Sequence, residues 1–180
     1  ITGSSASDFA RTTFVTGLGV AWIHSIFQFG DDVGFITAYG TVHSLKATAA
    51  FGDYNQAYFS YPIGRYVRES LVHSRAQFFT SKNDPGNGRV WIGITPSGQT
   101  TNTRHLLMDY RFLSQNESYP RWSYWDTQSF ASLAYVRDSN SRPRIMAGGY
   151  NGNVYRHDQE GRTVNGTAIN FNVQTASMTY

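Results

Sequence analysis

The stretch that decides the fold class is Ala147-Gly-Gly-Tyr-Asn-Gly-Asn-Val-Tyr-Arg-His-Asp158, in which an Asn-Gly pair separates two short runs. Asn-Gly between alternating runs is the strongest short-range signal for a β-hairpin, because both residues accept the positive φ of a tight turn. The unit Gly-x-Val followed by an aromatic residue or His occurs three times, beginning at Gly40, Gly88 and Gly152. Repetition of a turn-plus-strand unit indicates a modular β architecture.

The first third of the chain predicts a meander, in which consecutive strands are joined by short turns. Side chains alternate from Val20 to Phe29, a pattern expected of a strand that is covered on both sides. A turn at Gly30 leads to a second strand over Val33 to Tyr39, and a third runs from Thr41 to Lys46. Neighbouring strands joined by such turns are antiparallel.

One short helix is expected between the strands, near residues 63–75. Ile63, Val67 and Leu71 recur at the four-residue spacing that places side chains on one face of a helix. The stretch Ser60-Tyr-Pro-Ile-Gly64 is suited to start this helix, because proline is tolerated in a first turn.

A second hairpin is predicted over Arg89 to Thr95 and His105 to Phe112. In its second strand, one set of alternate side chains marks a core face: Leu106, Met108, Tyr110 and Phe112. The other set marks a wetter face: His105, Leu107, Asp109 and Arg111. The alternation specifies the register of the strand pair.

The last third of the chain predicts more short strands. They are Arg121 to Trp125, Phe130 to Val136 and Arg144 to Tyr150, followed by an extended segment over Arg162 to Met178. The sequence therefore predicts an all-β chain of antiparallel meanders.

Clusters of about four short strands are typical of β-propeller blades. We expect residues 1–180 to form a single all-β domain or a fragment of a larger propeller, with blade-like units near 18–60, 77–115 and 120–178. This amounts to two or three blades, whereas a closed propeller needs about four or more. The first residue is Ile, so we expect sequence to be missing upstream. A β-sandwich is the alternative fold.

The composition is unusual for a free-standing soluble domain. Aromatic residues make up 16% of the 180 residues and charged residues only 15%. We therefore expect part of the surface to be buried against neighbours. Cysteine is absent, which excludes disulfides, thiolate metal sites and a thiol nucleophile.

Positive charge is concentrated in the second part of the chain. Residues 1–62 hold two basic and four acidic residues, and the rest hold thirteen basic and eight acidic residues. Arg outnumbers Lys 13 to 2, and Arg favours forked ion pairs and aromatic stacking. Because no run of five basic residues occurs, surface and interface arginines are favoured over a dedicated nucleic-acid patch. No stretch approaches the roughly 20 apolar residues that cross a bilayer.

Several longer motifs form an ordered series along the chain. They are Val33 to Thr48 with Phe51-Gly-Asp-Tyr54 and Ser60-Tyr-Pro-Ile63, Trp91 to Asn102, Met108-Asp-Tyr-Arg111 with Pro120 to Trp125, and Gly148 to Asp158 with Asn165 to Ile169. This series resembles the later blades of phage virion propeller proteins, in particular the packaged-DNA stabilisation and head–tail ring or collar proteins of tailed phages. The resemblance covers most of the chain.

The resemblance implies a structural component of a tailed-phage virion, in the neck, collar or tail ring, that contributes to head–tail assembly and genome retention without catalysis. Its partners would be copies of itself in a ring, other phage neck or tail proteins and, non-specifically, packaged DNA. It would reside in the virion, assembled in the host cytoplasm, with no cofactor and no membrane contact. The alternative is a receptor- or glycan-binding module on the virion surface.

Two groups of residues are candidates for contact surfaces. Arg137, Arg142 and Arg144 cluster around a turn, where they would contact phosphates or ion-pair with an adjacent subunit. Trp122, Tyr124 and Trp125 form an aromatic run. Aromatic platforms stack sugars or bases, but on a strand they more often belong to a core or a subunit interface.

Catalytic and metal sites are less favoured by the sequence. A glycan-degrading enzyme would need two acids flanking the bond, to be sought among Asp109, Asp126 and Asp158. The histidines lack metal-ligand spacing: they are His24, His43, His73, His105 and His157. The pair Asp31-Asp32 beside a glycine is better explained as a solvated turn than as a calcium loop.

Overall fold

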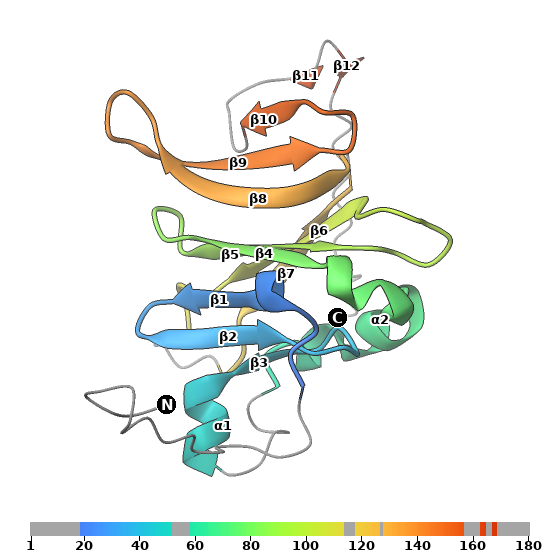
Figure 1. Cartoon of the computed structure of the whole chain (residues 1–180). Helices are drawn as coiled ribbons and strands as arrows, with labels where there is room; N and C mark the ends of the chain where they lie inside the picture. The colour runs from blue at the N-terminus through green and yellow to red at the C-terminus, as the bar shows by residue number, and fades with distance from the viewer. Residues whose placement is uncertain are drawn as a thin grey trace, which may run out of the picture.

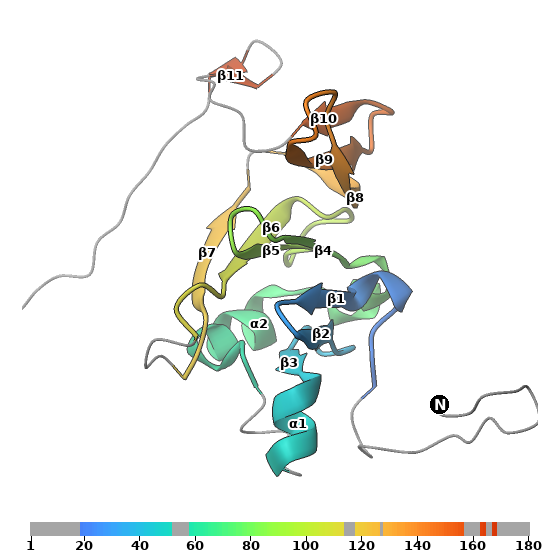
Figure 2. The ribbon, with the colours of Figure 1, turned by 90° about the vertical axis from the view of Figure 1, so that its left-hand side faces the viewer.

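The computed structural model describes residues 19–51, 58–113, 118–126 and 128–156, together with the short segments 163–164 and 167–168. Within these residues the structure is mostly β, with three antiparallel sheets of three or four strands and a few short helices. Figure 1 shows the three sheets as successive layers, and Figure 2 shows the same order of layers from the side. The prediction of an all-β chain is confirmed.

The first sheet contains β1 (Ile26–Phe29), β2 (Asp32–Ile36) and β3 (Val42–Ser44), in that order. A 3-10 turn, η1 (Ile23–Ser25), precedes β1, so the strand is shorter than predicted. Phe27 and Phe29 are buried, whereas Ile26 and Gln28 are exposed. The prediction that this strand is covered on both sides was wrong, because only one of its faces packs against the second sheet.

A helix that the sequence did not predict, α1 (Leu45–Phe51), follows β3 directly. The Ser44 hydroxyl accepts a 3.0 Å hydrogen bond from the Ala47 N–H, and the Asp32 carboxylate accepts one of 3.0 Å from the Lys46 N–H. These oxygens satisfy N–H groups that a first helical turn leaves without partners. The strand expected over residues 41–46 therefore ends at Ser44, where the helix begins. One of the capping oxygens comes from Asp32 on another strand.

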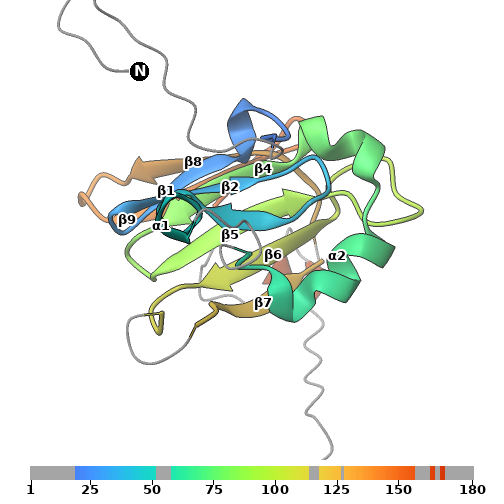
Figure 3. The ribbon, with the colours of Figure 1, turned by 90° about the horizontal axis from the view of Figure 1, so that it is seen from below.

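The predicted helix near 63–75 is present as three shorter pieces. They are η2 (Tyr61–Ile63), α2 (Gly64–Ser70) and η3 (His73–Phe78). Val67 and Leu71 are buried as the spacing predicted. The helix breaks at Leu71, whose backbone is extended and forms an isolated β-bridge with Pro96. In Figure 3, α2 lies beside β6 and β7 of the second sheet.

The second sheet contains β4 (Thr80–Asp84), β5 (Arg89–Ile94), β6 (Arg104–Asp109) and β7 (Arg121–Trp125), in that order. The predicted hairpin formed by β5 and β6 is confirmed, with Ile92 opposite Leu106. β7 pairs with β6 and so belongs to the second sheet, whereas the sequence-based units placed it with the third, near 120–178. Pairing across the long loop after β6 carries no local sequence signal.

Both faces of the second sheet are covered. Leu106 and Met108 are buried, as predicted for the core face. On the opposite face, His105 is 1% exposed, and its ring centre lies 4.7 Å from that of Phe130. The prediction of a wetter face was therefore wrong at His105, because the start of the third sheet covers it.

The third sheet contains β8 (Phe130–Arg137), β9 (Pro143–Gly149) and β10 (Val154–Arg156), with β9 in the middle. The hairpin predicted at Asn151-Gly152 is confirmed: Gly152 has a φ of 80°, and Val154 lies opposite Gly148. Two short strands, β11 (Thr163–Val164) and β12 (Thr167–Ala168), pair with each other. The rest of the predicted segment 162–178 lies outside the described residues.

The sheets follow one plan, in which each begins with a strand that adjoins the first strand of the next sheet. β1 contacts β4, and β4 contacts β8. From these first strands, each meander runs to its neighbours in chain order. The main core lies between the first two sheets and the helical pieces: it includes Phe27, Phe29, Ile36, Val67, Phe79, Ile92, Leu106 and Met108.

Candidate functional site

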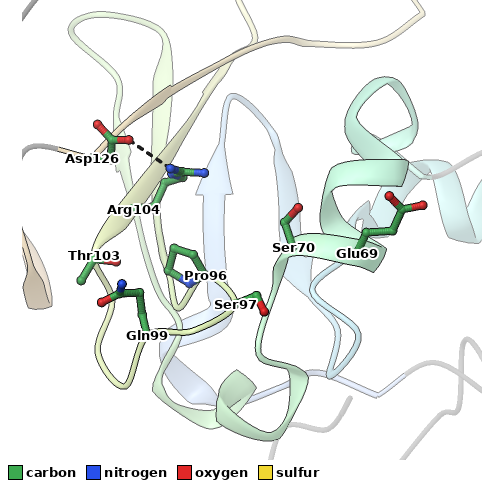
Figure 4. Close-up of a pocket in the computed structure, with 8 residues that line it drawn as sticks. All are labelled: Glu69, Ser70, Pro96, Ser97, Gln99, Thr103, Arg104 and Asp126. Atoms are coloured by element: carbon green, nitrogen blue, oxygen red, sulfur yellow. Dashed lines mark hydrogen bonds and ion pairs between the residues drawn. The ribbon is translucent and has the colours of Figure 1, made fainter.

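A polar cleft of about 500 Å³ opens between the end of α2, the loop after β5 and the ends of β6 and β7 (Figure 4). Its lining combines charged residues with neutral polar ones. The charged residues are Glu69, Arg104 and Asp126, and the neutral ones include Ser70, Ser97, Gln99 and Thr103.

Backbone hydrogen bonds hold the two walls of this polar cleft together. The Ser97 N–H donates to the carbonyl of Ser70 at 2.8 Å, and the Val72 N–H donates to the carbonyl of Thr95 at 3.0 Å. These bonds attach the loop after β5 to the segment that leaves α2. The relative position of the walls is thus fixed by the fold.

Arg104 is the charged residue of the polar cleft that contacts Tyr66, Tyr124 and Asp126. Its guanidinium donates one hydrogen bond to the Tyr66 hydroxyl at 2.9 Å and another to Asp126 Oδ2 at 3.0 Å. The guanidinium carbon also lies 4.7 Å from the ring centre of Tyr124. Burial lowers the pKa of Arg104, but Tyr66 and Asp126 raise it by more, so the net direction is upward. Arg104 is therefore a fixed cation at this edge of the sheet.

The polar cleft is suited to binding polar groups by hydrogen bonds. Asp126 is already paired with Arg104, and Glu69 is paired with Arg65, with 3.0 Å between the paired atoms in each case. In Figure 4, Glu69 and Asp126 lie on opposite sides of the cleft. The sequence pattern did not single out Arg104, because its partners come from α2 and β7, which are distant in the chain.

The acids considered for glycan cleavage do not meet in one site among the described residues. Asp109 pairs with Arg111, whose hydrogen bonds lower the pKa of the Asp109 carboxyl. A general acid requires a shift in the opposite direction. Asp126 lies in the polar cleft, and Asp158 lies outside the described residues.

The aromatic run on β7 is divided between two faces of the sheet. Trp122 and Tyr124 lie opposite Met108 and Leu106, whereas Trp125 lies on the other face, with its ring centre 5.5 Å from that of Trp91. The Trp122 indole N–H donates to the carbonyl of Phe59 at 3.1 Å. Tyr124 is exposed beside Arg104. The structure does not bring the three rings together into one platform, because side chains alternate along a strand.

The three candidate arginines all lie on the hairpin between β8 and β9. Asp138 organises this hairpin: its carboxylate accepts hydrogen bonds from the Asn140 N–H and the Arg142 N–H, both at 2.9 Å, and from Arg144 Nε at 3.2 Å. The Arg137 guanidinium donates to the carbonyl of Ser141 at 3.1 Å. The hydrogen bond from Arg142 and those from the other two donors lower the pKa of the Asp138 carboxyl.

His43 and the Asp31-Asp32 pair have structural surroundings. The His43 ring stacks with those of Phe35 and Tyr58, at centre-to-centre distances of 5.7 Å and 5.4 Å. Asp31 pairs with Lys46, and Asp32 caps α1. His157 lies outside the described residues. Where the structure describes the chain, no three metal-ligating side chains are grouped to hold an ion, and no helix has the length and apolar character needed to cross a membrane.

Comparison of the chain with protein-family models, with curated proteins and with solved structures finds no match.

Proposed function

We propose that this chain is a structural component of a tailed-phage virion, in the neck, collar or tail ring, and that its sheets are consecutive blades of a β-propeller. The observation that carries the proposal is the succession of first strands. β1 adjoins β4 and β4 adjoins β8, and each sheet is a meander that leads away from these strands. Radial repetition of such sheets is the plan of a propeller.

The outer faces of the first and third sheets expose apolar side chains that another sheet or subunit could cover. Ile145 and Ala147 are buried on the face of β9 that packs on the second sheet. On the opposite face, Val136 and Val154 are exposed. At the other end of the stack, Ile26 is exposed on the outer face of β1. Exposed apolar side chains on a sheet favour a covering sheet or subunit.

The order of motifs along the chain, which resembles phage virion propeller proteins, supports the placement in a virion. Copies of the chain in a ring and other neck or tail proteins are the proposed partners. Assembly of such a particle rests on protein–protein contacts, which the high aromatic content also favours.

Cryo-EM of virions that contain this chain is the direct test. We expect density for the three stacked sheets in a ring coaxial with the portal or the tail tube. Location at the tip of a peripheral fibre, or absence of the chain from purified particles by mass spectrometry, would overturn the proposal.

A variant tests the role of the open face. Val154→Asp places a charge on the exposed face of the third sheet, and we expect it to lower incorporation into particles without loss of fold. Tyr39→Asp is the matched control, because Tyr39 is exposed in the turn after β2. Equal incorporation of the two variants would argue against packing on the Val154 face.

The hairpin arginines are proposed to contact phosphates of packaged DNA. Arg137 and Arg142 are exposed, whereas Arg144 is partly neutralised by Asp138. Contacts of this kind are insensitive to sequence and weaken as salt concentration rises. We expect the double variant Arg137→Gln and Arg142→Gln to reduce the salt dependence of DNA binding in a filter assay. An unchanged salt dependence would exclude these two residues as phosphate contacts.

A further inference from the structure

A second pocket, of about 280 Å³, lies where elements of all three sheets meet. It is distinct from the polar cleft of Figure 4. Four aromatic residues line it: Trp22, Phe78, Phe79 and Tyr150. Phe79 is buried, whereas the other three are exposed. Ala131 and three polar residues complete the lining: His24, Gln77 and Thr80. We refer to it below as the aromatic pocket.

The three exposed aromatic residues come from segments that are far apart in the chain. Trp22 precedes β1, Phe78 precedes β4 and Tyr150 follows β9. Their exposed fractions are 55%, 48% and 45%. One exposed aromatic side chain is ordinary on a protein surface, whereas three around one hollow indicate a contact surface.

The aromatic pocket is held in shape by a buried polar residue, Asn102. Its side-chain amide donates a 2.7 Å hydrogen bond to the carbonyl of Phe78, and its backbone N–H donates one of 3.3 Å to the Tyr150 hydroxyl. The Thr95 hydroxyl in turn donates to Asn102 Oδ1 at 2.7 Å. Asn102 therefore links Phe78 to Tyr150. The segment that carries Trp22 is attached by a different contact.

That attachment is provided by the turn that carries Trp22 and His24. The Ser81 hydroxyl on β4 donates a 2.8 Å hydrogen bond to the carbonyl of His24. The guanidinium carbon of Arg75 lies 4.4 Å from the ring centre of Phe78. The first contact fixes the backbone at His24 and the second holds the Phe78 ring, which lowers the entropy that binding must remove.

We propose that the aromatic pocket binds one sugar ring of a neutral carbohydrate. A sugar ring has C–H groups on its faces and hydroxyl groups around its edge. Aromatic rings attract C–H groups through their electron-rich faces, and Gln77, His24 and Thr80 offer hydrogen-bond donors and acceptors to hydroxyls. This combination of apolar walls with a few polar groups is typical of small-molecule sites.

The charge of the lining favours a neutral ligand. None of the residues that line the aromatic pocket is Asp, Glu, Lys or Arg. A phosphate would meet no cationic side chain in the lining, and an alkyl chain would leave the polar groups without partners. The inference does not depend on the proposed virion role.

Binding is tested with the whole chain and a panel of neutral sugars: glucose, galactose, mannose, N-acetylglucosamine and their trisaccharides. We expect at least one to bind saturably in saturation-transfer NMR. We also expect it to shift the Trp22 indole resonance, which is identified by its loss in Trp22→Phe. Absence of binding by every sugar of the panel overturns the proposal.

Variants locate the site. Tyr150→Ala and Trp22→Ala are expected to weaken binding on the order of tenfold, as loss of a stacking ring does elsewhere. Trp22→Phe should retain binding, and Tyr39→Ala is the control for an exposed aromatic outside the pocket. Circular dichroism checks that each variant is folded. Sugar binding that is unchanged in both alanine variants overturns the assignment. Oligothymidylate tests base stacking instead: if it binds in a Trp22-dependent way and no sugar binds, the assignment is also overturned.

Discussion

The side-chain amide of Asn102 donates a 2.7 Å hydrogen bond to the carbonyl oxygen of Phe78, and so ties the loop between β5 and β6 to the segment that enters β4. Asn102 and Thr95 are both fully buried, and the Thr95 hydroxyl donates a hydrogen bond to Asn102 Oδ1. The Asn102 amide therefore joins the Phe78 carbonyl to the Thr95 hydroxyl. Its removal would leave the Phe78 carbonyl and the buried Thr95 hydroxyl without those bonds.

We expect Asn102→Ala to lower the free energy of unfolding by about 3 kcal/mol, because each buried polar group left unsatisfied costs about 1–3 kcal/mol. Urea denaturation followed by fluorescence measures the change. Asn140→Ala, in the exposed turn after β8, is the matched control and should cost less than about 0.5 kcal/mol. Similar losses in the two variants would contradict a structural role for the Asn102 amide.

Gly34 is required by the close approach of Phe27, its partner on β1. A Cβ atom at Gly34 would lie 2.3 Å from Cε2 of the Phe27 ring. We expect Gly34→Ala to destabilise the protein by about 1–3 kcal/mol, since Phe27 must leave its position in the packed core. Thermal denaturation of Gly34→Ala is compared with that of Gly19→Ala, where a Cβ would meet nothing within 4 Å. Equal melting temperatures would show that the core accommodates the methyl group.

The forked geometry of Arg104 distinguishes it from a surface cation. Lysine has a single ammonium group and cannot reproduce the contacts with Tyr66, Asp126 and the Tyr124 ring. We expect Arg104→Lys to cost about 1–2 kcal/mol in chemical denaturation. Arg65→Lys is the control, because the Arg65 side chain is 85% exposed and that of Arg104 only 26%. A cost for Arg104→Lys no larger than for Arg65→Lys would contradict this difference.

The Asp138 carboxyl makes the β8–β9 hairpin sensitive to acid. Hydrogen bonds from Arg142 and its neighbours hold its pKa below the ordinary value of 3.8. A lowered pKa in the folded state means that ionised Asp138 stabilises the fold above about pH 4, and that this contribution is lost as the pH falls through the folded pKa. Asp138→Asn should therefore reduce the melting temperature at about pH 7 but have a smaller effect at about pH 2.5.

The control for the acid experiment is Ser139→Ala in the same hairpin, where the side chain is exposed. Its effect on the melting temperature should be the same at both pH values, because serine does not titrate in this range. An effect of Asp138→Asn that is as large at low pH as at neutral pH would indicate that the amide perturbs the hairpin sterically.

Local signals in the sequence were sufficient for most strands and turns. The Asn151-Gly152 hairpin, the pairing of β5 with β6 and the burial of Val67, Leu106 and Met108 were predicted from turn residues and periodicity alone. These features depend on backbone preferences and on alternation within one segment. They required no knowledge of what packs against that segment.

The candidate sites depended more strongly on the tertiary structure. The placement of Arg137, Arg142 and Arg144 on one hairpin was predictable, because all three flank the same turn. The aromatic residues of β7 were close in sequence, yet strand alternation places Trp125 on the opposite face from Trp122. Proximity in sequence therefore placed the arginines on one hairpin, but it did not bring the rings of β7 together on one face.

The sequence by itself determined the all-β class, the meander connections and the main hairpins, since these arise from contacts between neighbouring segments. Only the tertiary structure decided that β7 joins the second sheet, that His105 is buried beneath Phe130, and that α1 begins at a cap supplied partly by Asp32. It alone also brought Trp22, Phe78 and Tyr150 around one pocket. The physical reason is that which face of a strand is covered, and which side chains converge, depends on packing between residues far apart in the chain.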